Sequence, residues 1–111
     1  MNQANEVPGV PAAGLPEDIF LLDVREDDEW VAGHAPGAVH IPLGQLGGRA
    51  DQVPRDRDVY VVCRAGSRSA YAAQALSTGG WKVINVADGM QGWASAGRPM
   101  VSESGQPPFV A

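Results

Sequence analysis

The chain has 111 residues and a formal net charge of -5, with 44% hydrophobic and 19% charged residues. These values fit one globular domain with a modest core, and they exclude a disordered chain or a second domain. The acidic balance argues against nucleic acid and anionic membrane surfaces as partners, because both require a basic face. The sequence has neither an apolar run of membrane-spanning length nor a signal-peptide pattern, so we expect a cytoplasmic protein.

The two ends of the chain differ from its middle. Residues 1–18 hold prolines and glycines without an apolar period, which predicts a loose N-terminal arm with a short extended piece near Val7 or Val10. Residues 102–111 have a similar composition and predict a C-terminal tail. The folded domain is therefore expected over residues 19–101.

Strand and helix patterns alternate through this domain. Short apolar and β-branched runs predict buried strands, and the segments between them have helical spacing, caps or glycine stops. In chain order the predicted elements are a strand at 19–24, a helix with an acidic first turn at 26–33, a strand at 38–41, a glycine-weakened helix at 43–53, a strand at 58–62, an alanine-rich helix from Ser69 to Gly79, a strand at 81–86 and a short helix after Asp88. Asp88 is predicted to cap the last helix, with Gln91 in the capping-box position. This succession predicts an α/β fold with a mainly parallel sheet and helices on both faces.

The only cysteine, Cys63, directly follows the strand at 58–62 and precedes the next helix. Ligands of open α/β sheets bind at such a junction, beyond the carboxyl ends of the strands. The positive end of the helix dipole and the nearby amide N–H groups favour the thiolate form of the cysteine, which is the reactive form. Arg64 and Arg68 add two positive charges, so the pattern predicts a nucleophilic thiol.

Small and hydroxyl residues complete this loop. Gly66 allows a strained backbone in which successive N–H groups converge on one point, and Ser67 and Ser69 cap the helix or donate hydroxyl groups. Composition alone leaves an alternative, a small buried cysteine beside a solvated basic surface. Because cysteine, glycine, two hydroxyls and two arginines gather between Cys63 and Ser69, we favour an anion cradle with a sulfur nucleophile at its floor.

Three motifs, in the same order along the chain, resemble those of the rhodanese family. Residues 22–42 look like its amino-terminal signature, residues 60–69 like its active-site loop, and residues 89–93 like its closing glycine-tryptophan motif. The residues of the outer two motifs to which the resemblance assigns a structural role are Asp23, Arg25, Glu29, His34, Gly89, Gly92 and Trp93. The helix that usually precedes the first signature is shortened or absent here.

The resemblance implies a rhodanese-like three-layer fold with a five-stranded, mainly parallel sheet. It also implies an enzyme that transfers sulfane sulfur through a persulfide on Cys63. A small anionic donor such as thiosulfate would supply the sulfur, and cyanide, a thiol or a protein cysteine would accept it. The residues expected to bind the substrate are Arg64, Ala65, Gly66, Ser67, Arg68 and Ser69. No cofactor and no metal are expected, and we expect a monomer.

Two other functions remain open from the sequence. The first is a non-catalytic rhodanese-like module that binds a partner or senses redox state. The second is a cysteine-based phosphatase or arsenate reductase, whose loops usually read C-x5-R. Here Arg68 makes C-x4-R, and Ser69 stands where the longer loop would place its arginine. The shorter loop suits a sulfur atom better than a phosphoryl group, and the absence of a second cysteine leaves no resolving thiol for a disulfide cycle.

Overall fold

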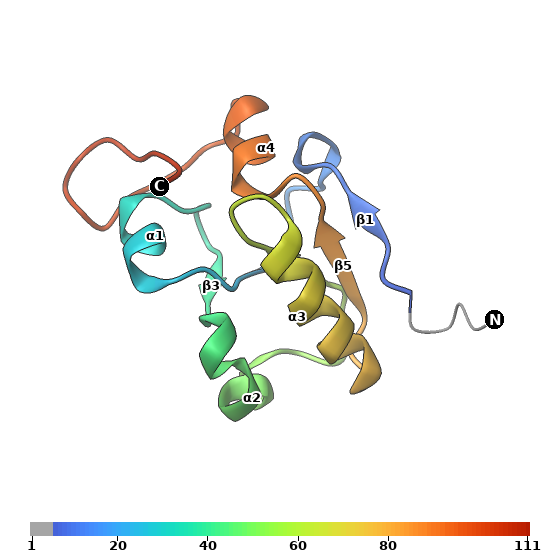
Figure 1. Cartoon of the computed structure of the whole chain (residues 1–111). Helices are drawn as coiled ribbons and strands as arrows, with labels where there is room; N and C mark the ends of the chain where they lie inside the picture. The colour runs from blue at the N-terminus through green and yellow to red at the C-terminus, as the bar shows by residue number, and fades with distance from the viewer. Residues whose placement is uncertain (1–5) are drawn as a thin grey trace.

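The sheet of this protein has five strands in the order β1-β5-β4-β2-β3, and every pair of neighbours is parallel (Figure 1). The computed structural model describes residues 6–111. The strands are β1 (Gly9–Val10), β2 (Phe20–Asp23), β3 (Val39–His40), β4 (Val59–Val62) and β5 (Val83–Val86). The last four lie within the predicted segments, which confirms the α/β class and the parallel sheet.

Helices connect the strands in the predicted order. They are α1 (Asp27–Ala32), α2 (Leu46–Arg49), α3 (Ser67–Thr78) and α4 (Gly89–Ser95), with short 3-10 turns η1 (Ala12–Gly14), η2 (Leu43–Gln45) and η3 (Ala50–Gln52). A capping box between Glu26 and Glu29 begins α1. The segment predicted as one helix over 43–53 is divided into η2, α2 and η3, in agreement with the low helix propensity of its glycines.

Helices cover both faces of the sheet, as the three-layer prediction requires. Successive residues of a strand point to opposite faces, so Leu22 of β2 packs with Ala72 and Leu76 of α3, whereas Leu21 packs with Met90 of α4. Figure 1 shows α3 across one face of the sheet and α4 near its upper end. The carboxyl ends of β4 and β5 therefore lie between the first turns of these two helices.

The N-terminal region differs from the expectation of a loose arm. Gly9–Val10 forms the edge strand β1 beside β5, while Ala12 and Leu15 are buried in the cluster under α4. The extended piece expected near Val10 is thus part of the sheet. Such pairing leaves no local sequence signal, because its partners lie in the last third of the chain. Residues 1–5 of the predicted arm lie outside the described residues.

The predicted capping box of α4 is wrong. Asp88 occupies the N-cap position, but its side chain makes no hydrogen bond to the helix. Its Oδ1 instead accepts a hydrogen bond of 2.9 Å from the backbone N–H of Ala12. The backbone N–H of Gln91 donates to the carbonyl of Arg64. A tertiary contact with the N-terminal segment has therefore replaced the local cap.

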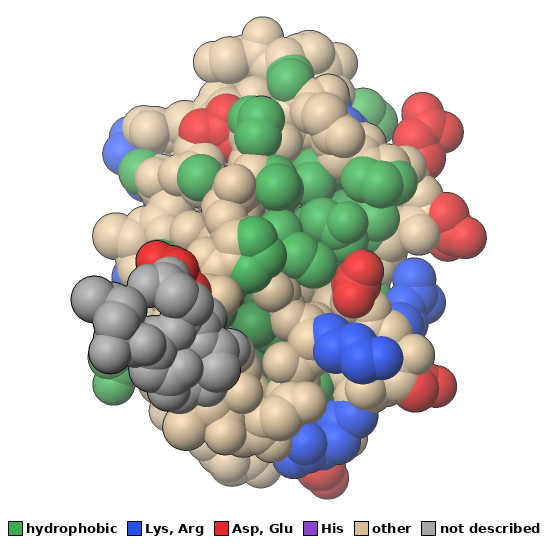
Figure 2. All heavy atoms as spheres, turned by 90° about the vertical axis from the view of Figure 1, so that its right-hand side faces the viewer, with side chains coloured by type: hydrophobic (Ala, Val, Ile, Leu, Met, Phe, Trp, Pro, Cys, Tyr) green, Lys and Arg blue, Asp and Glu red, His purple; other side chains and the backbone are tan. Residues whose placement is uncertain are grey.

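Hydrophobic side chains gather in the middle of the surface seen from the β1 edge, with charged side chains toward its margins (Figure 2). The face of the sheet opposite to α3 is covered mainly by α4 and η1. As a result, Val10, Ile19 and Tyr60 are only half-buried against the cluster beneath these elements.

Candidate active site

Cys63 directly follows strand β4 and lies at the floor of the loop that connects β4 to α3. The Sγ atom accepts hydrogen bonds from the backbone N–H of Gly66 at 3.1 Å and from the hydroxyl of Ser69 at 3.3 Å. Gly66 has a φ of 110°, a left-handed conformation that its lack of a side chain permits. Cys63 is 1% exposed, so its sulfur is enclosed by the loop that would hold a substrate.

These contacts change the acidity of the thiol. Burial is the largest single influence and raises the pKa of Cys63. Hydrogen bonds from the Ser69 hydroxyl and from the backbone N–H groups of Ser69, Gly66 and Ala65 act in the opposite direction and together outweigh burial. The pKa of Cys63 is therefore lowered from its ordinary value, which increases the thiolate fraction at neutral pH.

Helix α4 holds the other side of the loop. The backbone N–H groups of Met90 and Gln91 donate to the carbonyls of Cys63 at 2.8 Å and Arg64 at 3.0 Å. Gly89 allows this close approach, because a Cβ atom there would lie 2.4 Å from the carbonyl oxygen of Arg64. The closing glycine motif thus holds the backbone of the active-site loop through hydrogen bonds from the first turn of α4.

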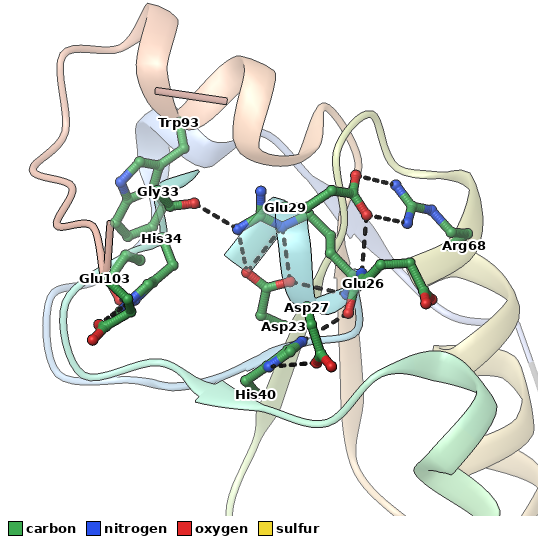
Figure 3. A network of polar contacts seen from close by, with 12 residues as sticks. Asp23, Glu26, Asp27, Glu29, Gly33, His34, His40, Arg68, Trp93 and Glu103 are labelled. Atoms are coloured by element: carbon green, nitrogen blue, oxygen red, sulfur yellow. Dashed lines mark hydrogen bonds and ion pairs between the residues drawn. The ribbon is translucent and has the colours of Figure 1, made fainter. Parts of the chain in front are cut away.

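Arg68 is paired with Glu29 of α1. Its guanidinium makes two hydrogen bonds, of 2.7 and 2.9 Å, to the two carboxylate oxygens (Figure 3). The hydrogen bond with Arg68 is the main cause that lowers the pKa of Glu29 to about 2, and the same contact raises the pKa of Arg68. The positive charge that Arg68 brings to the predicted cradle is therefore largely offset by Glu29, and the pair links α1 to the first turn of α3.

The remaining loop residues face solvent. Arg64, Ala65 and Ser67 are exposed, and the Nε–H of Arg64 donates to the carbonyl of Ala111 at 3.1 Å. Arg64 is thus the arginine of the loop that has no Asp or Glu partner among the described residues. Among the predicted substrate-binding residues, Gly66 and Ser69 therefore contact Sγ, whereas Arg64, Ala65 and Ser67 form an outer, exposed group.

The first signature forms a buried ion pair beneath α1. Asp23 and Arg25 are both 0% exposed, and the Arg25 guanidinium donates to the Asp23 carboxylate at 2.8 to 3.1 Å. A further hydrogen bond of 2.8 Å reaches the carbonyl of Gly33 at the end of α1 (Figure 3). This pair anchors α1, and with it Glu29, to the end of β2.

His34 and Trp93 also have structural contacts. The ring nitrogens of His34 lie 3.0 Å from the Ala35 carbonyl and 2.7 Å from the Glu103 carboxylate (Figure 3). Trp93 is buried in the cluster under α4, and its indole N–H donates to the carbonyl of Pro99. Gly92 leaves room for the carboxylate of Asp88. None of these contacts touches the Cys63 sulfur.

Asn85 is the residue of this region that the sequence analysis did not identify. It lies on β5, is 9% exposed, and donates from Nδ2 to the carbonyl of Gly66 at 3.2 Å. The sequence signal that could have identified Asn85 is a polar residue within the apolar strand β5, because a buried amide normally has a hydrogen-bond partner.

Two hollows of the described surface lie away from the loop. One of about 660 Å³ borders Trp93 and Arg98, and an apolar one of about 230 Å³ lies between α2 and α3. Within residues 6–111, no group of three or more His, Cys, Asp or Glu side chains could hold a metal ion. None of the helices in this part of the chain has the length and apolar character that crossing a bilayer requires.

Comparison with known proteins agrees with this geometry. A protein of Allochromatium vinosum named "Sulfurtransferase" is 37% identical over 90 residues, which cover 80% of this chain and 84% of that protein. "Putative sulfur carrier protein YrkF" of Bacillus subtilis is 44% identical over 78 residues. That alignment covers 69% of this chain but only 42% of the relative, so this chain spans less than half of the longer protein.

Solved structures have the same fold. A rhodanese-related protein from Thermoplasma volcanium superimposes with a TM-score of 0.80 and 34% identity, covering 85% of this chain and 97% of its own. A thiosulfate sulfurtransferase from Pseudomonas aeruginosa has a TM-score of 0.76 and 26% identity, covering 92% of this chain and 21% of its own. The family model of the rhodanese-like domain matches residues 12–96. The chain therefore belongs to the rhodanese-like domain family, as its three motifs indicate.

Proposed function

We propose that this protein is a sulfurtransferase of the rhodanese type, which carries sulfane sulfur as a persulfide on Cys63. The observation that carries the proposal is the environment of Sγ, which accepts hydrogen bonds from the Gly66 N–H and the Ser69 hydroxyl. A buried thiol surrounded by donors is suited to hold negative charge on sulfur. The names of its relatives support the same reaction class.

The reaction has two half-steps. With thiosulfate as donor, the Cys63 thiolate attacks the outer sulfur, a new S–S bond forms, and the bond to the sulfonate group breaks. Its electron pair leaves with sulfite, so the products are the Cys63 persulfide anion and sulfite. A second nucleophile then attacks the outer sulfur of the persulfide and restores the thiolate. Cyanide would leave as thiocyanate, and a small thiol or a protein cysteine would leave as its own persulfide.

The loop residues have separate roles in this scheme. The N–H groups around Sγ and the Ser69 hydroxyl stabilise the thiolate and the persulfide anion. Arg64, which is exposed, attracts the anionic donor and stabilises the departing sulfite. Arg68 acts mainly through Glu29, by holding α1 beside the loop.

We further propose that the protein works as a monomer in the cytoplasm, with a small anionic donor and without nucleic acid or membrane partners. A reducing compartment keeps a lone catalytic thiol free for sulfur chemistry. The net charge of -5 opposes binding to phosphate backbones and anionic lipids.

The test is an intact-mass measurement after incubation with thiosulfate, for the parent protein and for Cys63→Ser. We expect a gain of one sulfur atom that requires Cys63 and is removed by cyanide as thiocyanate. Thr78→Val is the matched control, because it removes a hydroxyl at the far end of α3 from Sγ, and it should still gain the sulfur.

Failure to gain sulfur would separate the alternatives. If thiosulfate gives no adduct but a low-molecular-weight persulfide does, the transferase mechanism stands and thiosulfate is not the donor. If folded protein with a free thiol takes sulfur from neither, the non-catalytic binding or redox-sensing module is favoured. Hydrolysis of an aryl phosphate that depends on Cys63 would favour the phosphatase.

A further inference from the structure

The Ser69 hydroxyl lies between two acceptors but has one proton to donate. Its Oγ is 3.3 Å from the Cys63 Sγ and 3.2 Å from the carbonyl oxygen of Gly66. A hydroxyl can satisfy only one acceptor at a time, so these two contacts compete. The proton stabilises the thiolate only when it points to sulfur.

The Gly66 carbonyl has two other donors. The backbone N–H of Ala70 donates to it at 3.1 Å, as in any helix, and Asn85 Nδ2 donates at 3.2 Å from β5. A carbonyl oxygen has two lone pairs, which these two N–H groups can fill. When both are filled, the Ser69 proton has its better acceptor in the anionic sulfur.

Asn85 itself is placed for this contact and for little else. It is 9% exposed, and its Oδ1 has no hydrogen-bond partner among the described residues. A buried amide oxygen without a partner is costly, so the amide group is not explained by stability alone. Valine or leucine would suit a core position of a parallel strand better.

We propose that Asn85 is a positioning residue which, by occupying the Gly66 carbonyl, directs the Ser69 hydroxyl proton to the Cys63 sulfur. This proposal rests on the function proposed above and adds to it a residue outside the active-site loop. Without Asn85, one lone pair of the carbonyl is free, and the Ser69 hydroxyl turns away from sulfur. The thiolate then loses a donor although no residue of the loop has changed.

Charged groups near the loop do not change in this substitution. Arg64 and Arg68 lie on the loop and at the start of α3, with Glu26 and Glu29 on the α1 side and Asp88 at the start of α4. Asn85 is neutral, and replacing it with leucine removes no charge. A change in thiol reactivity would therefore report the hydrogen-bond arrangement and not a new electrostatic field.

The test is the rate of Cys63 alkylation by iodoacetamide between pH 5 and pH 10, which follows the thiolate fraction. We expect Asn85→Leu to slow alkylation at pH 7 by roughly threefold to tenfold, the effect of losing one hydrogen bond of ordinary net strength. The two proteins should react alike at high pH, where the thiol is fully ionised. Thr78→Val, which removes a hydroxyl at the far end of α3, is the matched control and should leave the profile unchanged.

A double-mutant cycle with Ser69→Ala distinguishes positioning from general damage. If Asn85 acts through the Ser69 hydroxyl, Asn85→Leu has little further effect once that hydroxyl is absent. Independent effects that multiply, or an Asn85→Leu profile identical to the parent, would overturn the proposal. Asn85→Val serves as the second variant if Asn85→Leu does not fold, with the same expected and contradicting results. The alkylation rate does not depend on sulfur transfer. If the double-mutant cycle gives the expected result in a protein that takes up no sulfur, Asn85 is still a positioning residue and only the proposed sulfur-transfer reaction is rejected.

Discussion

Glu29 and Arg68 join α1 to α3 through two parallel hydrogen bonds, and the carboxylate is only 14% exposed. The pKa of Glu29 is about 2 in the folded protein, below the ordinary 4.5. A depressed carboxyl pKa contributes stability that is present above pH 4.5 and is lost as the pH falls toward 2. The contribution of this ion pair to the free energy of unfolding is therefore lost in acid.

We predict that Glu29→Gln lowers the free energy of unfolding by about 1–2 kcal/mol at pH 6, allowing for solvent screening of the partly exposed Arg68. The difference from the parent should shrink between pH 4.5 and pH 2, as measured by urea unfolding. Asp28→Asn on the exposed side of α1 is the control and should cost about 0.5 kcal/mol or less. A Glu29→Gln deficit that stays constant down to pH 2 would contradict this assignment.

The buried pair of Asp23 and Arg25 should behave differently, because neither side chain reaches water. Asp23→Asn leaves the Arg25 cation buried without its counter-charge, and we expect a loss of about 3–5 kcal/mol in chemical denaturation. Replacing both residues together, Asp23→Leu with Arg25→Met, should restore much of that loss. A double variant no more stable than Asp23→Asn would show that the damage lies in packing and not in the unpaired charge.

Gly66 has two reasons to be glycine, a φ of 110° and a close approach to the residue that follows β5, since a Cβ atom would lie 2.1 Å from the carbonyl oxygen of Ala87. We predict that Gly66→Ala costs more than about 2 kcal/mol of stability and lowers Cys63 reactivity. Gly97→Ala separates the two causes, because Gly97 has a φ of 71° with nothing within 4 Å of the added carbon. It should cost only about 1 kcal/mol and leave the thiol unchanged. Equal losses in the two variants would leave no role for the contact with Ala87.

Asp88→Ala tests whether this carboxylate holds the N-terminal segment or begins α4. Because Oδ1 accepts from the Ala12 N–H, we expect faster amide hydrogen exchange around Ala12 and a loss of about 1 kcal/mol. Exchange in the first turn of α4 should change little. Faster exchange confined to the first turn of α4 would instead indicate that Asp88 caps this helix.

Local patterns were sufficient to predict much of this molecule. The alternation of apolar runs and caps located β2, β3, β4 and β5, and the glycine- and arginine-rich junction after β4 placed Cys63 at the end of the sheet where ligands bind. These features depend on residues close together in the chain. The motifs shared with the rhodanese family extended them to the three-layer fold.

Long-range partners were not predictable in the same way. The pairing of Arg68 with Glu29, the contact of Asp88 with Ala12 and the bond from Asn85 to the Gly66 carbonyl each join distant parts of the sequence. A single sequence shows which side chains could pair but not which ones meet. Arg68 is an example, because its position in the nucleophile loop can be read from the sequence but its pairing with Glu29 cannot.

The hydrogen bonds from Met90 and Gln91 to the carbonyls of Cys63 and Arg64 have a consequence for biosynthesis. The ribosome completes the nucleophile loop well before it completes the segment that holds the loop backbone. A nascent chain that stops short of α4 therefore has its cysteine but lacks part of the frame around it. The frame around the thiol is therefore complete only after the closing glycine motif has emerged from the ribosome.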